Sequence, residues 1–240
     1  MKPSTIILLV LLTLYITAIF ASNIILKQTF NKLDKRDSYW NYNKISVRSF
    51  RHLKVTGGNV SNIIYEPSTS SSVRALNYLE FYLKDRIKIS YLKDTLFLEV
   101  SDHNTSLSLK DWIRSKVLIR LFSPELLSVQ AANTNLALFK FKQKELSCRV
   151  TGKSQLEVES YVSDIDHISV TARDSTKIHF EMAPELNASR SMHLNTLDAR
   201  VQGNSILDVG HFRIETARYV IEDTSAIVLS GKTLSFLQQR

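Results

Sequence analysis

Two stretches of the sequence share one pattern: Val150-Thr-Gly-Lys-Ser-Gln-Leu-Glu-Val158 returns as Val201-Gln-Gly-Asn-Ser-Ile-Leu-Asp-Val209. Divergent copies begin at Ala131, Ala172 and Ile221, so the pattern recurs about every 20 residues. Each copy follows a second run in which apolar and other residues alternate. The repeating unit is therefore two short strands joined by a small polar turn.

A unit of two strands cannot bury its apolar face alone, whereas stacked units share one continuous core. Strand alternation then directs four aliphatic side chains of successive units inward as one row: Leu156, Ile178, Leu207 and Ile227. Five turn hydroxyls fall in register and predict a column that satisfies backbone groups at the corner: Thr134, Ser154, Thr176, Ser205 and Ser225. The sequence predicts an all-β fold, a single-strand parallel β-solenoid over residues 47–233. The competing fold, an antiparallel β-sandwich, also has alternating strands but does not explain the returning turn sequence.

An uncharged segment precedes the repeats. No charged residue lies between Pro3 and Leu26, which is long enough to cross the roughly 30 Å apolar core of a bilayer as a helix. We expect one N-terminal transmembrane helix, an uncleaved signal anchor over residues 1–27 that contacts membrane lipid through residues 3–26. A cleaved signal peptide ending near Ala21 is the alternative.

Charge is concentrated next to this segment. Residues 1–60 hold nine Lys and Arg against two Asp, and the remaining residues are nearly neutral. We therefore interpret residues 28–46 as a basic juxtamembrane neck that meets anionic headgroups, and residues 234–240 as a C-terminal tail. Nucleic acid is not an expected partner, because binding it needs a basic surface on the folded domain. The basic neck alone favours a cytoplasmic body by the positive-inside rule, which conflicts with export.

Several motifs follow one another in a fixed order. An N-terminal membrane segment is followed by Phe50-Arg-His-Leu-Lys-Val-Thr-Gly-Gly58, Asp94-Thr-Leu-Phe-Leu98, Ser123-Pro-Glu-Leu-Leu127 and the repeated Val-x-Gly-x-Ser-x-Leu units. This order resembles the auto-transporter adhesin head (GIN) domain family of Bacteroidota-type bacteria. The resemblance covers about residues 47–231. It implies a right-handed parallel β-solenoid held outside the cytoplasm, here on the inner (cytoplasmic) membrane through a single span. It brings no catalytic residues.

Three outward rows of the repeats are candidate binding surfaces. One row holds Glu157, His179 and Asp208, a second holds Arg149 and Arg200, and a third ends at Arg218. Solvated polar ladders and surface salt links are the simpler interpretation of all three. Cys148 falls on an inward position and is expected to be a buried structural thiol.

Catalytic motifs are missing from the sequence. It contains no phosphate-binding glycine loop, no Gly-x-Ser-x-Gly elbow and no His-Glu-x-x-His. We therefore predict a non-enzymatic protein without catalytic residues, cofactor or metal, with an adhesion, binding or envelope-structural role toward a glycan or another envelope protein. Two alternatives remain open: a carbohydrate-active enzyme that cleaves an acidic polysaccharide with Glu157, His179 and Asp208, or a signalling or scaffold partner.

Overall fold

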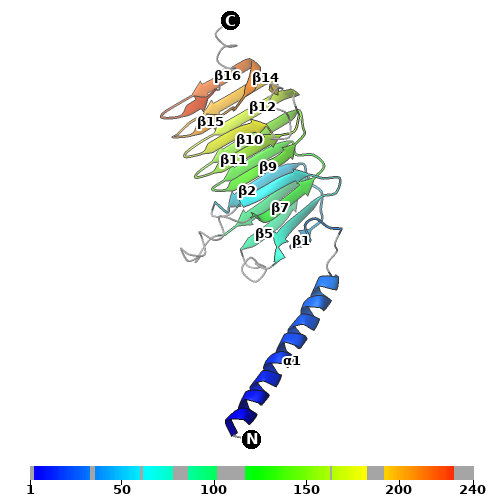
Figure 1. The fold of residues 1–240 in the computed structure, drawn as a ribbon. Coiled ribbons are helices and arrows are strands. Elements are labelled where there is room, and N and C mark those ends of the chain that lie inside the picture. Colours follow the sequence, from blue (N-terminus) through cyan, green and yellow to red (C-terminus); the bar gives the residue numbers. More distant parts are fainter. Residues whose placement is uncertain are drawn as a thin grey trace. The chain divides into compact units, whose positions relative to one another are not determined.

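The computed structural model describes residues 3–32, 36–59, 62–77, 86–101, 117–162, 164–182 and 192–229. Within these ranges it consists of one helix followed by β-strands, which confirms the prediction of a mostly β protein behind an apolar helix (Figure 1). The chain divides into two compact units, Met1–Tyr42 and Asn43–Arg240. The predicted tail 234–240 lies outside the described residues.

The helix α1 spans Pro3–Lys32. Its segment Pro3–Asn31 is long and apolar enough to cross a membrane, with a mean hydropathy of 2.4, although an N-terminal signal sequence has the same properties. Its threonine hydroxyls donate hydrogen bonds back to helix carbonyls, as Thr13 Oγ1 does to Leu9 O at 2.8 Å and Thr29 Oγ1 to Ile25 O at 2.9 Å. These polar groups are therefore satisfied inside the helix, as a lipid environment requires.

The strands form two sheets. The nine-stranded sheet has the order β1 (Tyr42–Ser46), β4 (Ser72–Leu76), β7 (Val117–Ser123), β3 (Asn62–Pro67), β9 (Asn135–Phe141), β11 (Gln155–Ser160), β13 (Lys177–Met182), β15 (Ile206–Asp208) and β17 (Ala226–Val228). The eight-stranded sheet has the order β16 (Phe212–Ile221), β14 (Met192–Val201), β12 (Asp164–Ala172), β10 (Glu145–Thr151), β8 (Ser128–Ala132), β2 (His52–Gly57), β6 (Thr95–Val100) and β5 (Ile87–Leu92).

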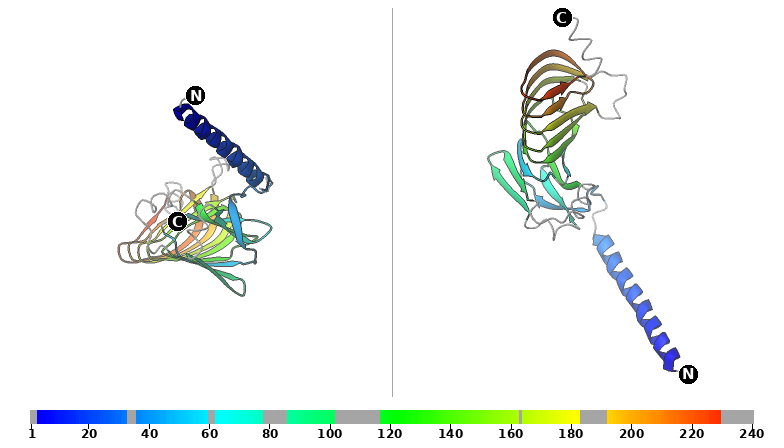
Figure 2. Two further views of the ribbon diagram at one scale, coloured as in Figure 1. Left: turned by 90° about the horizontal axis from the view of Figure 1, so that it is seen from below. Right: turned by 90° about the vertical axis from the view of Figure 1, so that its left-hand side faces the viewer.

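From β8 onward the chain alternates between the two sheets, and from β10 onward each strand pairs in parallel with the strand two places earlier (Figures 1 and 2). We call one pair of consecutive strands in this coil, such as β10 and β11, a rung. The register is the predicted one: Leu156 pairs with Ile178, Ile178 with Leu207, and Leu207 with Ile227. The first three side chains of this row are at most 1% exposed. Burying each of them contributes about 1.5–3 kcal/mol.

The N-terminal part departs from a uniform single-strand solenoid, so that prediction is wrong for these rungs. The strand β2 lies between β6 and β8, and β3 lies between β7 and β9, so the rungs are stacked out of chain order. Two pairs are antiparallel: β4 with β7, and β5 with β6. For the second pair the physical reason is the tight turn at Lys93 (φ 54°), which folds β5 back on β6 as a hairpin. The sheets are consequently mixed.

One corner of the coil requires a left-handed backbone in every rung. The residue two places after the start of each copy has a positive φ: Asn133 (52°), Gly152 (70°), Asp174 (72°), Gly203 (62°) and Asp223 (59°). Glycine and Asn or Asp alternate at this corner. Each of these polar side chains accepts a hydrogen bond from a backbone N–H of a neighbouring turn: Asn133 Oδ1 from Lys153, Asp174 Oδ2 from Gly152, and Asp223 Oδ2 from Gly203. Asp and Asn therefore occupy glycine positions because their side chains stabilise the adjacent turn.

The predicted hydroxyl column stands beside this corner. Ser154 Oγ accepts a hydrogen bond from Thr134 N at 3.2 Å, Ser205 Oγ from Thr176 N at 3.4 Å, and Ser225 Oγ from Ser205 N at 3.3 Å. The prediction that these hydroxyls satisfy corner backbone groups is confirmed for the three serines, whereas the Thr134 and Thr176 hydroxyls are buried without a hydrogen bond to the described residues. Each bond links one rung to the next, so the column holds the rungs in register.

Apolar side chains fill the space between the two sheets. The rings of Phe180 and Phe212 pack edge to face with centroids 6.2 Å apart, and both side chains are at most 1% exposed. Cys148 points inward as predicted, and burial raises the pKa of its thiol to about 12. A thiol held protonated in this way packs as a small apolar group and is not a nucleophile.

Candidate functional site

The six candidate residues are divided between the outer faces of the two sheets. Glu157, His179 and Asp208 lie on β11, β13 and β15 of the nine-stranded sheet, in direct register. The other three lie on the eight-stranded sheet: Arg149 on β10, Arg200 on β14 and Arg218 on β16. The two groups therefore form separate surfaces.

His179 is the centre of the first surface. Its Nδ1 lies 3.0 Å from Oδ2 of Asp208, and its Nε2 lies 3.6 Å from Oε2 of Glu181. Glu157 instead accepts a hydrogen bond from its own-strand neighbour, because Gln155 Nε2 lies 2.6 Å from Oε1 of Glu157. The imidazole is thus enclosed by carboxylates of its own and the next rung, and Glu157 is engaged separately.

This first surface lacks the enclosure that acid–base catalysis favours. The side chains of His179 and Asp208 are 41% and 35% exposed, which leaves them in contact with water. Glu157 lines a shallow hollow of about 280 Å³ over β3, β9 and β11, together with Gln155, Asn135 and Phe139. Among the described residues no group of three His, Cys, Asp or Glu side chains is placed to hold a metal ion. The arrangement is an exposed ionic ladder.

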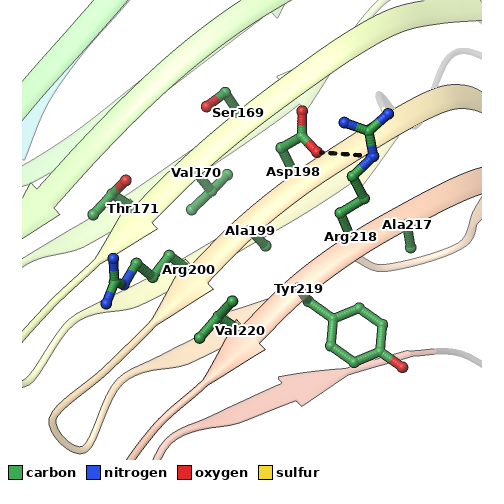
Figure 3. A pocket seen from close by; sticks show the side chains of 10 residues that line it. All are labelled: Ser169, Val170, Thr171, Asp198, Ala199, Arg200, Ala217, Arg218, Tyr219 and Val220. Atoms are coloured by element: carbon green, nitrogen blue, oxygen red, sulfur yellow. Dashed lines mark ion pairs between the residues drawn. The ribbon is translucent and has the colours of Figure 1, made fainter.

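The second surface contains a broader hollow of about 580 Å³. It lies over β12, β14 and β16, where Figure 3 shows Arg200 and Arg218 on either side of Ala199. We call it the arginine pocket; its lining also includes Ser169, Thr171, Asp198, Tyr219 and Val220. Two of the predicted residues, Arg200 and Arg218, therefore come together here, whereas Arg149 lies on β10, outside the lining.

Neighbouring carboxylates orient both arginines. Arg200 Nη2 lies 3.0 Å from Glu222 Oε1, and Arg218 Nε lies 4.0 Å from Asp198 Oδ1. The arginine side chains nevertheless remain 53% and 76% exposed. Asp198 also contacts His167 on the neighbouring strand β12, and the distance from His167 Nε2 to Asp198 Oδ2 is 2.9 Å. The pocket thus presents two positioned guanidinium groups with donor capacity toward solvent.

Sequence reasoning missed Tyr219. Alternation places Tyr219 in an inward row with Ala199, which is 6% exposed, and yet Tyr219 is 55% exposed. The physical reason is that β16 is the terminal strand of its sheet, so no later strand of the described chain covers this side chain. The signal was available in the sequence, since the copy beginning at Ile221 is the last one.

Comparisons with known proteins identify the fold only. No family model matches the chain, and no curated protein matches it. Eleven chains of solved structures match. One is a "Putative lipid binding protein" from Parabacteroides distasonis, with 15% identity, a TM-score of 0.52, and coverage of 78% of this chain and 80% of that chain.

Two further similar structures are described as adhesins. A "putative adhesin" from Parabacteroides distasonis has 14% identity and a TM-score of 0.43, covering 78% of this chain and 92% of that chain. Another, from Bacteroides fragilis, has 12% identity and a TM-score of 0.38, covering 78% of this chain and 95% of that chain. Scores below 0.5 support no conclusion, so the shared fold rests on the lipid-binding protein's structure.

Proposed function

We propose that this chain is a membrane-anchored, extracytoplasmic binding protein of the cell envelope, and that the arginine pocket binds an acidic glycan without cleaving it. In this proposal α1 is an uncleaved anchor in the inner membrane, residues 28–46 contain the basic neck, and the coil is a right-handed β-solenoid that serves as a stiff support. A GIN-like adhesin domain is the family role that the motif order favours. The fold shared with the solved lipid-binding protein is compatible with this role.

The observation that carries the proposal is the composition of the arginine pocket. Arg200 on β14 and Arg218 on β16 are cations on the outer face, on either side of the buried Ala199 (Figure 3). Guanidinium groups bind carboxylates in a bidentate manner, which suits the uronic acids of an acidic glycan. Ser169 and Thr171, on the same outer face as the two arginines, add hydroxyls for sugar oxygens.

A glycan-binding assay with paired variants tests this function. The full chain in detergent is expected to bind polygalacturonate and not neutral dextran, with affinity that falls as salt rises because exposed charges are screened. Arg200→Gln and Arg218→Gln should each weaken binding about tenfold, as the loss of one charge-assisted hydrogen bond would. Arg149→Gln is the matched control, because it removes the same charge from the same sheet outside the pocket.

The same experiment separates binding from catalysis. The specific observation that favours a polysaccharide-cleaving enzyme is the 3.0 Å contact between His179 and Asp208. An enzyme would release shortened chains from the acidic polysaccharide and lose this activity in Asp208→Ala. Equal binding by the Arg149→Gln and Arg200→Gln variants would disprove the role of the pocket, and turnover lost in Asp208→Ala would replace binding with catalysis as the function.

A further inference from the structure

Both sheets end at the same rung. The order of strands finishes at β16 in one sheet and at β17 in the other, and no further strand of the described chain covers either of them. Apolar side chains that are buried in earlier rungs are consequently uncovered here. Tyr219 and Ile221 are 55% and 43% exposed, whereas their partners Ala199 and Val201 on β14 are 6% and 0% exposed. A long, terminal, apolar strand is a template for pairing with another chain.

The sequence of β16 is complementary to itself when read in the opposite direction. It runs Phe-Arg-Ile-Glu-Thr-Ala-Arg-Tyr-Val-Ile from Phe212 to Ile221. In an antiparallel pair centred between Thr216 and Ala217, Glu215 of one copy stands opposite Arg218 of the other, and the reverse contact repeats the match. Such a pair places opposite charges directly across from each other twice, which stabilises an antiparallel ladder.

The apolar residues of β16 also face one another when the strands pair about this centre. Phe212 stands opposite Ile221, and Ile214 opposite Tyr219. Phe212 and Ile214 point into the core and are fully buried. The alternation is interrupted at Glu215 and Thr216, which are both exposed, so Tyr219 and Ile221 return to the inward side in register with the buried Ala199 and Val201. Pairing therefore opposes inward residues with inward residues, and outward Arg213 with outward Val220. A register shifted by one residue would oppose Glu215 to Ala217 or to Tyr219, and both charge matches would be lost.

We propose that two copies of this chain associate through antiparallel pairing of their β16 strands about a two-fold axis between Thr216 and Ala217. The interface is isologous, so the assembly closes at two copies and does not extend into a fibre. Within each copy the two charged residues are already oriented on the outer face: Glu215 Oε1 lies 3.5 Å from His193 Nε2, and Arg218 Nε lies 4.0 Å from Asp198 Oδ1. Because β16 also lines the arginine pocket, pairing places the pockets of two copies on neighbouring strands of one continuous sheet.

A charge-swap experiment on the full chain in detergent tests this pairing. The dissociation constant of the dimer is measured by analytical ultracentrifugation. Glu215→Arg and Arg218→Glu each place like charges opposite each other twice, and each should weaken the dimer about tenfold. The double variant Glu215→Arg/Arg218→Glu restores both opposite-charge contacts and should recover the dimer. Arg213→Glu is the matched control: it makes the same charge change as Arg218→Glu on the same strand, but opposite Val220, and should alter dimerisation less.

A crosslink fixes the register independently of charge. Thr216→Cys in a Cys148→Ala background should oxidise to a disulfide-linked dimer, because Thr216 lies next to the proposed axis. Cysteine at the exposed turn residue Lys153 should not. A monomer at all concentrations overturns the proposal. So does a dimer that ignores all the charge variants, since α1 would then be the source of association. Circular dichroism of each variant confirms the fold, and the crosslink decides the question if a charge variant unfolds.

Discussion

Replacing Gly152 by alanine tests the alternation of glycine with Asn or Asp at the coil corner. Gly152 has φ +70°, and a Cβ on it would lie 2.3 Å from Oδ1 of Asn133. The left-handed backbone costs an alanine about 1–2 kcal/mol. Moving the Asn133 side chain away also breaks its hydrogen bond from Lys153 N, worth about 1 kcal/mol. We expect Gly152→Ala to lower the free energy of unfolding by about 2–3 kcal/mol.

A double-mutant cycle separates the two contributions. Asn133 itself has φ 52°, so Asn133→Gly suits the backbone there and removes the atom that the new methyl group would meet. In that background Gly152→Ala should cost only the backbone term, about 1–2 kcal/mol, and the coupling between the sites should be about 1 kcal/mol. The assay is urea unfolding of the detergent-solubilised chain, followed by the circular dichroism of the sheets. Strictly additive effects, or a neutral Gly152→Ala, would refute the argument that side chains of one turn exclude side chains at the next.

Three further outcomes follow from the core and the anchor. Phe212→Ala should lower the free energy of unfolding by about 3–5 kcal/mol, because it empties a fully buried site against Phe180. In the same urea titration, Phe97→Ala should lower it far less, because the Phe97 side chain points outward. Burial raises the pKa of Cys148 from 9.0 to about 12, so between pH 9 and pH 12 only the unfolded chain releases this proton. The free energy of unfolding, relative to that of Cys148→Ala, should therefore stay level below pH 9 and fall by about 1.4 kcal/mol per pH unit from pH 9 toward pH 12. A difference that stays constant with pH would contradict the buried thiol. A compartment-dependent reporter fused after Arg240, with protease added to spheroplasts, should place the body outside the cytoplasm; a protected body would show that the basic neck, and not the family resemblance, sets the orientation.

The repeat was sufficient to predict the register of the C-terminal rungs. Leu156, Ile178 and Leu207 recur at one place in the copied pattern, and equivalent strands of successive coils run in the same direction, so they pair in parallel. The hydroxyl column followed from the same alignment, since Ser154 and Ser205 occupy the same turn position. Local pattern and tertiary contact agree in these rungs, which is why sequence alone identified them.

The order of the N-terminal rungs could not be derived in this way. A period shows that strands are equivalent, but it does not state which strands become neighbours. The strands β2 and β6 both alternate, and nothing in their residues places β2 between β6 and β8. The pocket was likewise only half predictable. Alignment brought Arg200 and Arg218 to the outer face, whereas the exposure of Tyr219 depends on where the stack stops.

The displaced rung has a mechanical consequence. A pull applied to the N-terminus reaches β2 soon after β1, and β2 is flanked by hydrogen-bonded strands on both sides, β6 and β8. Removing β2 therefore requires two parallel ladders to shear together, whereas a pull on the C-terminus peels β17 and β16 from the end of the stack one ladder at a time. The coil is thus expected to resist tension better from its N-terminal end than from its C-terminal end.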